Sequence, residues 1–187
     1  TEDSEEHKDL HLQKEVAHRL AALSSVELFH TLNEDERHVV AERLQPAPFA
    51  KGEAITRQDT EAHSLYIMTT GSAEVALSVA GAPRTAIATL HAGDFFGEMS
   101  LLTGDKRSAT VVALENVECY RLDKESFHDI LHKRPEIAEH ISHVLARRRM
   151  EHEAAREGLD AEARHGHMQH TQGAIFARIS AFFGLGS

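Results

Sequence analysis

The stretch of sequence that decides the fold is Gly93-Asp94-Phe95-Phe96-Gly97-Glu98-Met99-Ser100-Leu101-Leu102-Thr103-Gly104-Asp105-Lys106-Arg107-Ser108-Ala109-Thr110-Val111. We call residues 93–111 the cassette. Its pattern predicts a short helical turn over Glu98–Leu102, preceded by a glycine, and then a glycine-containing loop that delivers Arg107 at the start of a strand. The first backbone N–H groups of a helix have no acceptor within the helix, so they form a site for an anion.

Two charged side chains of the cassette, nine positions apart, complement this anion site. Arg107 carries a planar fork of donors that matches phosphate oxygens. Glu98, when ionised, only accepts hydrogen bonds, so it can receive the hydroxyl of a sugar such as a ribose 2′-OH. An anion site, a positive charge and a sugar acceptor in one short segment are what a cyclic nucleotide requires.

The cassette resembles the phosphate-binding cassette of cyclic nucleotide-binding domains, which occur in catabolite activators, protein-kinase regulatory subunits and nucleotide-gated channels. The similarity is carried by Phe96-Gly97-Glu98, Leu101-Leu102, Arg107-Ser108-Ala109, Gly52-Glu53 and Gly71. It covers roughly residues 26–150. It implies a β jelly roll flanked by α-helices, in which the helix after Pro135 acts as a lid.

The resemblance also implies roles for single residues. The cassette residues expected at the nucleotide are Gly97, Glu98, Met99, Ser100, Arg107, Ser108 and Ala109. The first three would cradle the ribose and phosphate, Arg107 would bind the phosphate, and the two serines would donate hydroxyl groups beside it. The implied ligand is cAMP, with cGMP as the alternative, because no residue that reads the base can be identified.

Outside the cassette, Val75 and Leu90 match the apolar positions against which the base lies. Arg148 occupies the lid position where some channel domains cover the base. It stands in a run of three arginines, so Arg147 or Arg149 remains an alternative.

Each of these roles has a plainer explanation. A buried Glu98–Arg107 ion pair could hold the loop without any ligand, as in a vestigial domain that binds only protein partners. Val75 and Leu90 could be ordinary core residues. The arginine run could be a solvated helix face that pairs with Glu151 and Glu153.

The flanking sequence predicts helices on both sides of a block of short strands. Residues 5–24 form an amphipathic pattern, and Asn33 is a suitable N-cap for a helix over Glu34–Leu44. Between Gln45 and Asp123, prolines and glycines punctuate the short runs 54–57, 65–69, 73–79, 85–90 and 109–113, which favours an antiparallel sandwich or jelly roll.

Helical patterns resume after the strands. They cover Lys124–Lys133, a long stretch from Pro135 to about Arg164, and a last segment over Ala174–Phe183. That last segment places Ile175, Phe176, Ile179, Phe182 and Phe183 on one apolar face. We therefore expect an N-terminal helical linker (1–25), a nucleotide-binding domain with its lid (26–150) and a C-terminal helical extension (151–187).

Composition excludes several classes of function. The 187 residues carry a formal net charge of −10, which opposes nucleic-acid binding. No apolar run approaches the ~20 residues of a membrane span, and the acidic stretch after Thr1 lacks a signal-peptide h-region, so we expect neither feature. The single cysteine, Cys119, excludes a disulfide framework and fits a reducing compartment. The histidines at 165, 167 and 170 lack a carboxylate at ligand spacing, and the strand block lacks a cupin-type His-x-His, so we expect neither a metal site nor an enzyme.

Four further segments of the sequence suggest which effector such a sensor controls. Residues 118–124, 134–139, 145–149 and 182–185 resemble bacterial mechanosensitive-type channels that carry a C-terminal nucleotide-binding domain. That resemblance implies a cytosolic domain of an inner-membrane protein, with the channel's transmembrane region as its partner. A catabolite-activator-type transcription factor is the alternative, although no helix-turn-helix pattern follows the lid. The helical ends could also pair with a second copy of the chain.

Overall fold

The computed structural model describes residues 2–78, 83–157 and 161–185. The chain begins with helix α1 (Glu2–Ser24), the 3₁₀ turn η1 (Glu27–Phe29) and helix α2 (Glu34–Arg43). Asn33 caps α2 as expected. Its side chain accepts a hydrogen bond from the Glu36 N–H at 2.9 Å, and the Glu36 carboxylate accepts one from the Asn33 N–H at 2.9 Å. This reciprocal capping box fixes where α2 begins.

Eight strands follow, with one short helix between them. The elements are β1 (Gln45–Phe49), β2 (Ala54–Thr56), β3 (Ser64–Thr70), β4 (Ser72–Leu77), β5 (Thr85–His91), β6 (Phe95–Phe96), α3 (Glu98–Thr103), β7 (Thr110–Ala113) and β8 (Val117–Asp123). They form two four-stranded antiparallel sheets, in the orders β1-β8-β3-β6 and β2-β7-β4-β5. The predicted jelly-roll sandwich flanked by helices is therefore confirmed.

Three strands, β1, β6 and β8, lie outside the runs expected from the sequence. Pro46 and Pro48 suggested a break, yet both lie in β1, which pairs with β8 alone. An edge strand tolerates proline because one side of its backbone needs no donor for the sheet. The partner strand β8 was likewise missing from the predicted runs, and it fills the place between β1 and β3.

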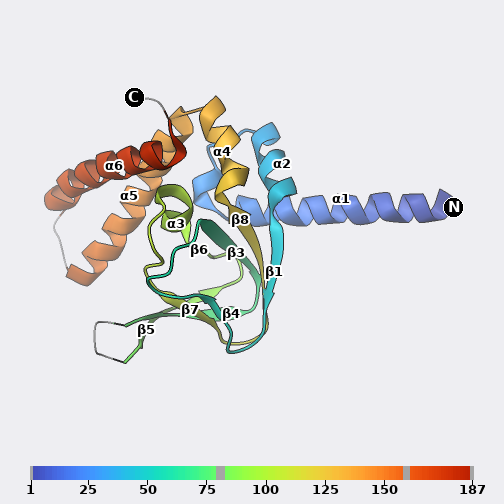
Figure 1. The fold of residues 1–187 in the computed structure, drawn as a ribbon, viewed down its shortest axis with the longest axis horizontal. Helices are drawn as coiled ribbons and strands as arrows, with labels where there is room; N and C mark the ends of the chain where they lie inside the picture. The colour runs from blue at the N-terminus through green and yellow to red at the C-terminus, as the bar shows by residue number, and fades with distance from the viewer. Residues whose placement is uncertain (1, 79–82, 158–160, 186–187) are drawn as a thin grey trace.

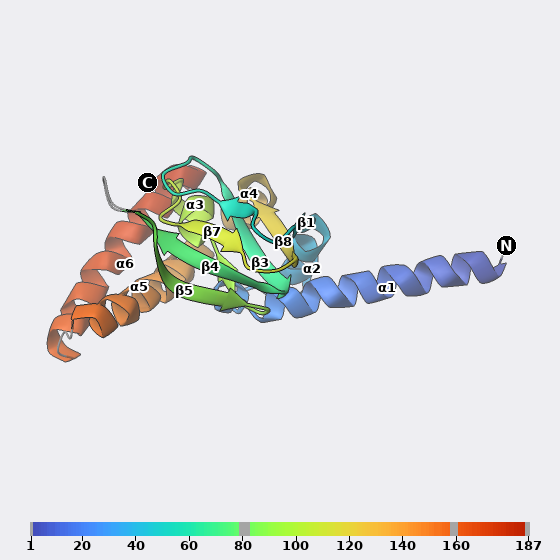
Figure 2. The same ribbon diagram turned by 90° about the horizontal axis from the view of Figure 1, so that it is seen from below.

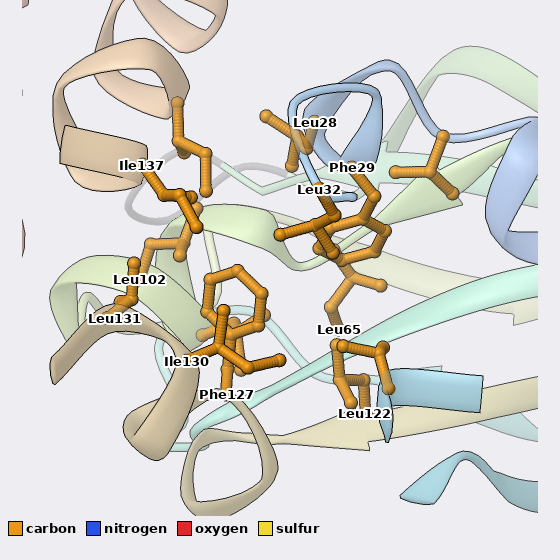
Figure 3. Close-up of a cluster of buried hydrophobic side chains, with 14 of the residues drawn as sticks. Leu28, Phe29, Leu32, Leu65, Leu102, Leu122, Phe127, Ile130, Leu131 and Ile137 are labelled. Atoms are coloured by element: carbon orange, nitrogen blue, oxygen red, sulfur yellow. The ribbon is translucent and has the colours of Figure 1, made fainter. Parts of the chain in front are cut away.

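Strand β3 separates two apolar interiors, because its residues from Ser64 to Met68 are all buried. Leu65 and Ile67 pack into a cluster beneath the helices, whereas Tyr66 and Met68 pack into a second cluster between the two sheets. Figure 3 shows the first cluster, where side chains from η1, β3, β8, α3 and the C-terminal helices converge. Alternate side chains of a strand point to opposite faces, which explains this division.

The C-terminal part consists of α4 (Lys124–Lys133), α5 (Glu136–Glu157) and α6 (Ala161–Phe183). The long helix predicted to about Arg164 thus ends earlier, at Glu157. The last helix begins before Ala174 and passes through Gly166 and Gly173. Gly158 lies outside the described residues. Helix α6 turns back along α5 toward α3 and α4, as both views show (Figures 1 and 2).

The apolar face predicted for the last segment is largely correct. Ile175, Ile179 and Phe183 are buried and join the cluster beneath the helices, so this face docks within the chain. Phe176 is the exception, because it is 37% exposed. The side chains of the histidines at 165, 167 and 170 lie outside those described.

Helix α1 extends away from the sandwich, as Figure 2 shows. The C-terminal half of α1 is anchored to β8 through Tyr120. The Tyr120 hydroxyl donates a hydrogen bond to Glu15 at 3.1 Å and is hydrogen-bonded to His18 Nδ1 at 2.7 Å. Leu23 is buried there, whereas Leu12, further out on the same face, is 61% exposed. The amphipathic face expected for this helix is therefore covered only near its C-terminal end.

Candidate functional site

The cassette begins where β6 ends, and its first helix depends on a glycine. Gly97 adopts a left-handed conformation (φ +85°) and serves as the N-cap of α3. A Cβ atom there would lie 2.3 Å from Nη1 of Arg107 and 2.9 Å from the carbonyl oxygen of Ser64. No side chain other than hydrogen fits, so Gly97 allows the guanidinium to approach the backbone directly.

Arg107 lies directly beneath this glycine and is only 5% exposed. Its Nη1 donates to the Ser64 carbonyl at 2.7 Å and weakly to the Gly97 carbonyl at 3.5 Å, while Nη2 donates to Ser64 Oγ at 3.1 Å. The guanidinium carbon also lies 5.8 Å from the centre of the Tyr66 ring. Among the described residues, no carboxylate forms an ion pair with Arg107.

This burial has an electrostatic consequence. Loss of hydration lowers the pKa of Arg107, and the neighbouring Tyr66 and Glu98 act in the opposite direction. A buried positive charge that is bonded only to neutral oxygens is costly unless an anion compensates it. The geometry therefore suits an anionic ligand.

Glu98 is half-buried at the first position of α3. Within the described part of the chain its carboxylate forms neither a hydrogen bond nor an ion pair, so the Glu98–Arg107 pair considered as a plainer explanation is not formed. Its acceptor oxygens are available to a ligand hydroxyl.

The remaining cassette residues differ in how accessible they are. The Ser100 side chain is buried on α3, whereas Ser108, directly after the arginine, is exposed. Met99 is half-buried, and its side chain packs against the cluster beneath the helices. Ala109 is half-buried, and its carbonyl accepts a bond from Thr56 Oγ1 at 3.3 Å.

Val75 and Leu90 lie on neighbouring strands of the second sheet. Val75 of β4 pairs with Ala88, and Leu90 of β5 pairs with Ala73, so both side chains share one face of the sheet. Both are half-buried and pack at the margin of the cluster between the sheets. They are thus partly core and partly accessible.

Arg148 of α5 lies against the ring of Phe95 on β6. Its guanidinium carbon lies 4.1 Å from the centre of the Phe95 ring, and its Nη1 is buried without a hydrogen-bond partner in that part of the chain. The neighbouring Arg147 forms an ion pair with Glu27 of η1. The side chains of Glu151 and Glu153, the partners considered from the sequence, lie outside those described. The side chain of Arg149 is not described.

Sequence reasoning missed Ser64, the residue that accepts two hydrogen bonds from Arg107. Nothing in the motif marks it, because it lies 43 positions earlier in the chain, at the start of β3. A serine at the head of a buried strand was the only available signal.

Comparisons with known proteins agree with this geometry. Residues 46–134 match the family model described as the cyclic nucleotide-binding domain. A cAMP-dependent protein kinase regulatory subunit from Blastocladiella emersonii is 33% identical over 111 residues, which are 59% of this chain and 28% of that protein. The cyclic AMP receptor protein of Thermus thermophilus is 31% identical over 121 residues, covering 65% of this chain and 56% of that protein.

A solved structure gives the same result. The regulatory domain of Toxoplasma gondii PKA with cAMP superposes with a TM-score of 0.58 at 30% identity, covering 66% of this chain and 51% of that one. The chain thus spans from about a quarter to just over half of these relatives. None of the three is a channel, and no helix among the described residues is long and apolar enough to cross a membrane.

Proposed function

Because this chain contains a cyclic nucleotide-binding domain over residues 46–134, we propose that it is a regulatory sensor whose ligand is cAMP. The observation that carries the proposal is the buried guanidinium of Arg107, which lies beneath Gly97 without a carboxylate partner among the described residues. The cAMP held by the Toxoplasma gondii relative supports the choice of ligand.

Arg107 retains donors for a phosphate even though it is already bonded. A guanidinium has five N–H donors, and the carbonyls of Ser64 and Gly97 together with Ser64 Oγ use three of them. Two remain for the cyclic phosphate. The Glu98 carboxylate would accept the ribose 2′-OH, and the hydroxyls of Ser100 and Ser108 would lie beside the phosphate.

The base would lie against the half-buried face that contains Val75 and Leu90. These apolar side chains contact either purine equally well, so they do not distinguish cAMP from cGMP. Ser108 is exposed beside Arg107 and could contact a phosphate or a guanine edge. Titration of both nucleotides decides between them.

Signalling requires that the nucleotide bind one arrangement of the lid better than another, because equal affinity shifts nothing. The lid is α5, and Arg148 connects it to Phe95, two residues before Gly97. A movement of the cassette would therefore alter the surface on which Arg148 rests. The Nη1 of Arg148 is buried and has no hydrogen-bond partner within the described part of the chain, which supports a change of partner when the ligand arrives.

Calorimetry of the chain with cAMP, cGMP and acyclic 5′-AMP tests the proposal. A ligand of this size, at ~0.3 kcal/mol per heavy atom, gives about −7 kcal/mol, which corresponds to a dissociation constant in the micromolar to tens-of-micromolar range. We expect Arg107→Ala to weaken cAMP binding by about two decades or more, since the lost charge-assisted bonds are worth about 3–5 kcal/mol.

Arg43→Ala is the matched control, because it removes the same charge from an exposed position on α2 and should leave the affinity unchanged. Binding by Arg107→Ala within about threefold of the wild type would contradict the assignment. If no nucleotide binds and none raises the thermal midpoint, the domain is instead a vestigial fold that binds protein partners.

The controlled effector is a separate proposal. The tail residues favour attachment to a channel, whereas the relatives described above are kinase regulators and a receptor protein. Fractionation of the native protein tests the channel directly. Recovery in the membrane fraction with a nucleotide-dependent conductance supports it, and recovery with a kinase or with DNA contradicts it. Light scattering tests whether the helical ends pair two copies.

A further inference from the structure

The last turns of α6 lie against the cassette, as the adjacent ends of α3 and α6 show (Figures 1 and 2). Ile175, Ile179 and Phe183 share one buried cluster with Leu101 and Leu102 of α3. The apolar face of α6 therefore completes the interior on which the cassette helix rests. Helix α6 also makes contacts outside this cluster, with the loop that leads to Arg107.

Phe182 makes the first of these contacts, with Gly104. A Cβ atom at Gly104 would lie 2.6 Å from its ring, so the ring packs directly on the glycine backbone. The same ring lies 5.0 Å from the His63 ring, edge to face, and 3.8 Å from Nζ of Lys124. One turn earlier on α6, Arg178 forms an ion pair with Asp105.

These contacts involve both segments that position Arg107, the arginine proposed to bind the phosphate. Gly104 and Asp105 precede Arg107 by three and two residues. His63 directly precedes Ser64, whose carbonyl and hydroxyl accept the bonds of the Arg107 guanidinium. Phe182 thus packs between the loop that carries the arginine and the strand that orients it.

We propose that Phe182 and Arg178 are positioning residues for Arg107, so that docking of α6 and binding of the nucleotide favour each other. The proposal rests on the function proposed above and adds α6 to the part of the molecule that responds to the ligand. Linkage requires reciprocity: if α6 strengthens nucleotide binding, the nucleotide strengthens the docking of α6 by the same factor.

The first test compares two phenylalanines of the same helix by calorimetry with cAMP. Phe182→Ala should weaken binding at least fivefold, whereas Phe176→Ala, at an exposed position, should stay within twofold of the wild type. Arg178→Ala should weaken binding about threefold, and the exchanged pair Asp105→Arg with Arg178→Asp should restore it. Circular dichroism checks that each variant is folded.

The second test needs no variant. Hydrogen exchange of the backbone amides of residues 174–183 in the wild type should slow when cAMP is added, and it should not change with 5′-AMP. A helix that is only a structural support would slow no more than α4, whose exchange follows the stability of the whole domain, so the slowing in α6 should exceed that in α4.

The possible failures are distinguishable. If the wild type binds cAMP while folded Phe182→Ala binds equally well, or if exchange in α6 ignores cAMP, the positioning role is wrong and the sensor function stands. If the wild type binds no cyclic nucleotide, the proposed function is wrong, and the positioning role falls with it.

Discussion

Replacing Gly97 with alanine tests whether the backbone at this position must lack a side chain for Arg107 to be held. Two costs add at this site. A left-handed conformation costs a residue with a Cβ about 1–2 kcal/mol. In addition, the new methyl group would lie 2.3 Å from Nη1 of Arg107, so the guanidinium must leave the two oxygens of Ser64.

A matched control separates the two costs. Gly52 has nearly the same backbone conformation (φ +89°), but a Cβ there would meet no atom within 4 Å. Gly52→Ala therefore carries the backbone cost alone. Gly97→Ala should lower the free energy of unfolding by about 2–4 kcal/mol more than Gly52→Ala does. Each lost hydrogen bond from the charged guanidinium is worth about 1.5–3 kcal/mol, and some of these bonds are replaced by bonds to water.

Urea denaturation and cAMP calorimetry measure the two consequences. The free energy of unfolding falls by ~2 kcal/mol for each molar of urea. The additional destabilisation therefore places the urea midpoint of Gly97→Ala about 1–2 M below that of Gly52→Ala. Gly97→Ala should also lose detectable cAMP binding, whereas Gly52→Ala should keep it. Equal midpoints and equal affinities in the two variants would refute the close packing of Arg107 on Gly97.

Two further predictions concern groups away from the cassette. Burial raises the pKa of Cys119 to about 12, so the thiol should react slowly with Ellman's reagent in the native protein and rapidly in urea; immediate reaction in buffer would contradict its burial. Burial tends to raise the pKa of Glu15, but hydrogen bonds from Arg19 and Tyr120 outweigh it and hold the pKa below its ordinary value of 4.5. The stabilisation is present above that value and is lost as the pH falls through the lower, folded-state pKa, so Glu15→Gln should flatten the loss of stability seen in thermal melts as the pH falls below 4.5.

The secondary structure was predicted most accurately from the sequence where a single local rule determines it. The Asn33 cap of α2 was identified because an asparagine stands directly before a helical pattern whose first turn is acidic. The turn of α3 after Gly97 was likewise identified from contiguous residues. Strand β1 was missed because Pro46 and Pro48 signal a break, and only its edge position in the sheet makes them acceptable.

The candidate site divides in the same way. Gly97, Glu98 and Arg107 belong to one segment, so their proximity could be inferred from the sequence. The contact of Phe182 with Gly104 joins residues far apart in the chain and depends on α6 turning back along α5. Local patterns do not encode that return, and for the same reason the cassette sequence did not point to Ser64.

Strand β3 has a consequence for how the molecule loses its structure. Since Leu65 and Ile67 close one apolar interior while Tyr66 and Met68 close the other, neither interior survives when this strand leaves the sheet. Melting should consequently be all-or-none, with a single transition seen by every probe. Any small molecule that tightens the sandwich would then protect distant helical segments from proteases, even where it touches none of them.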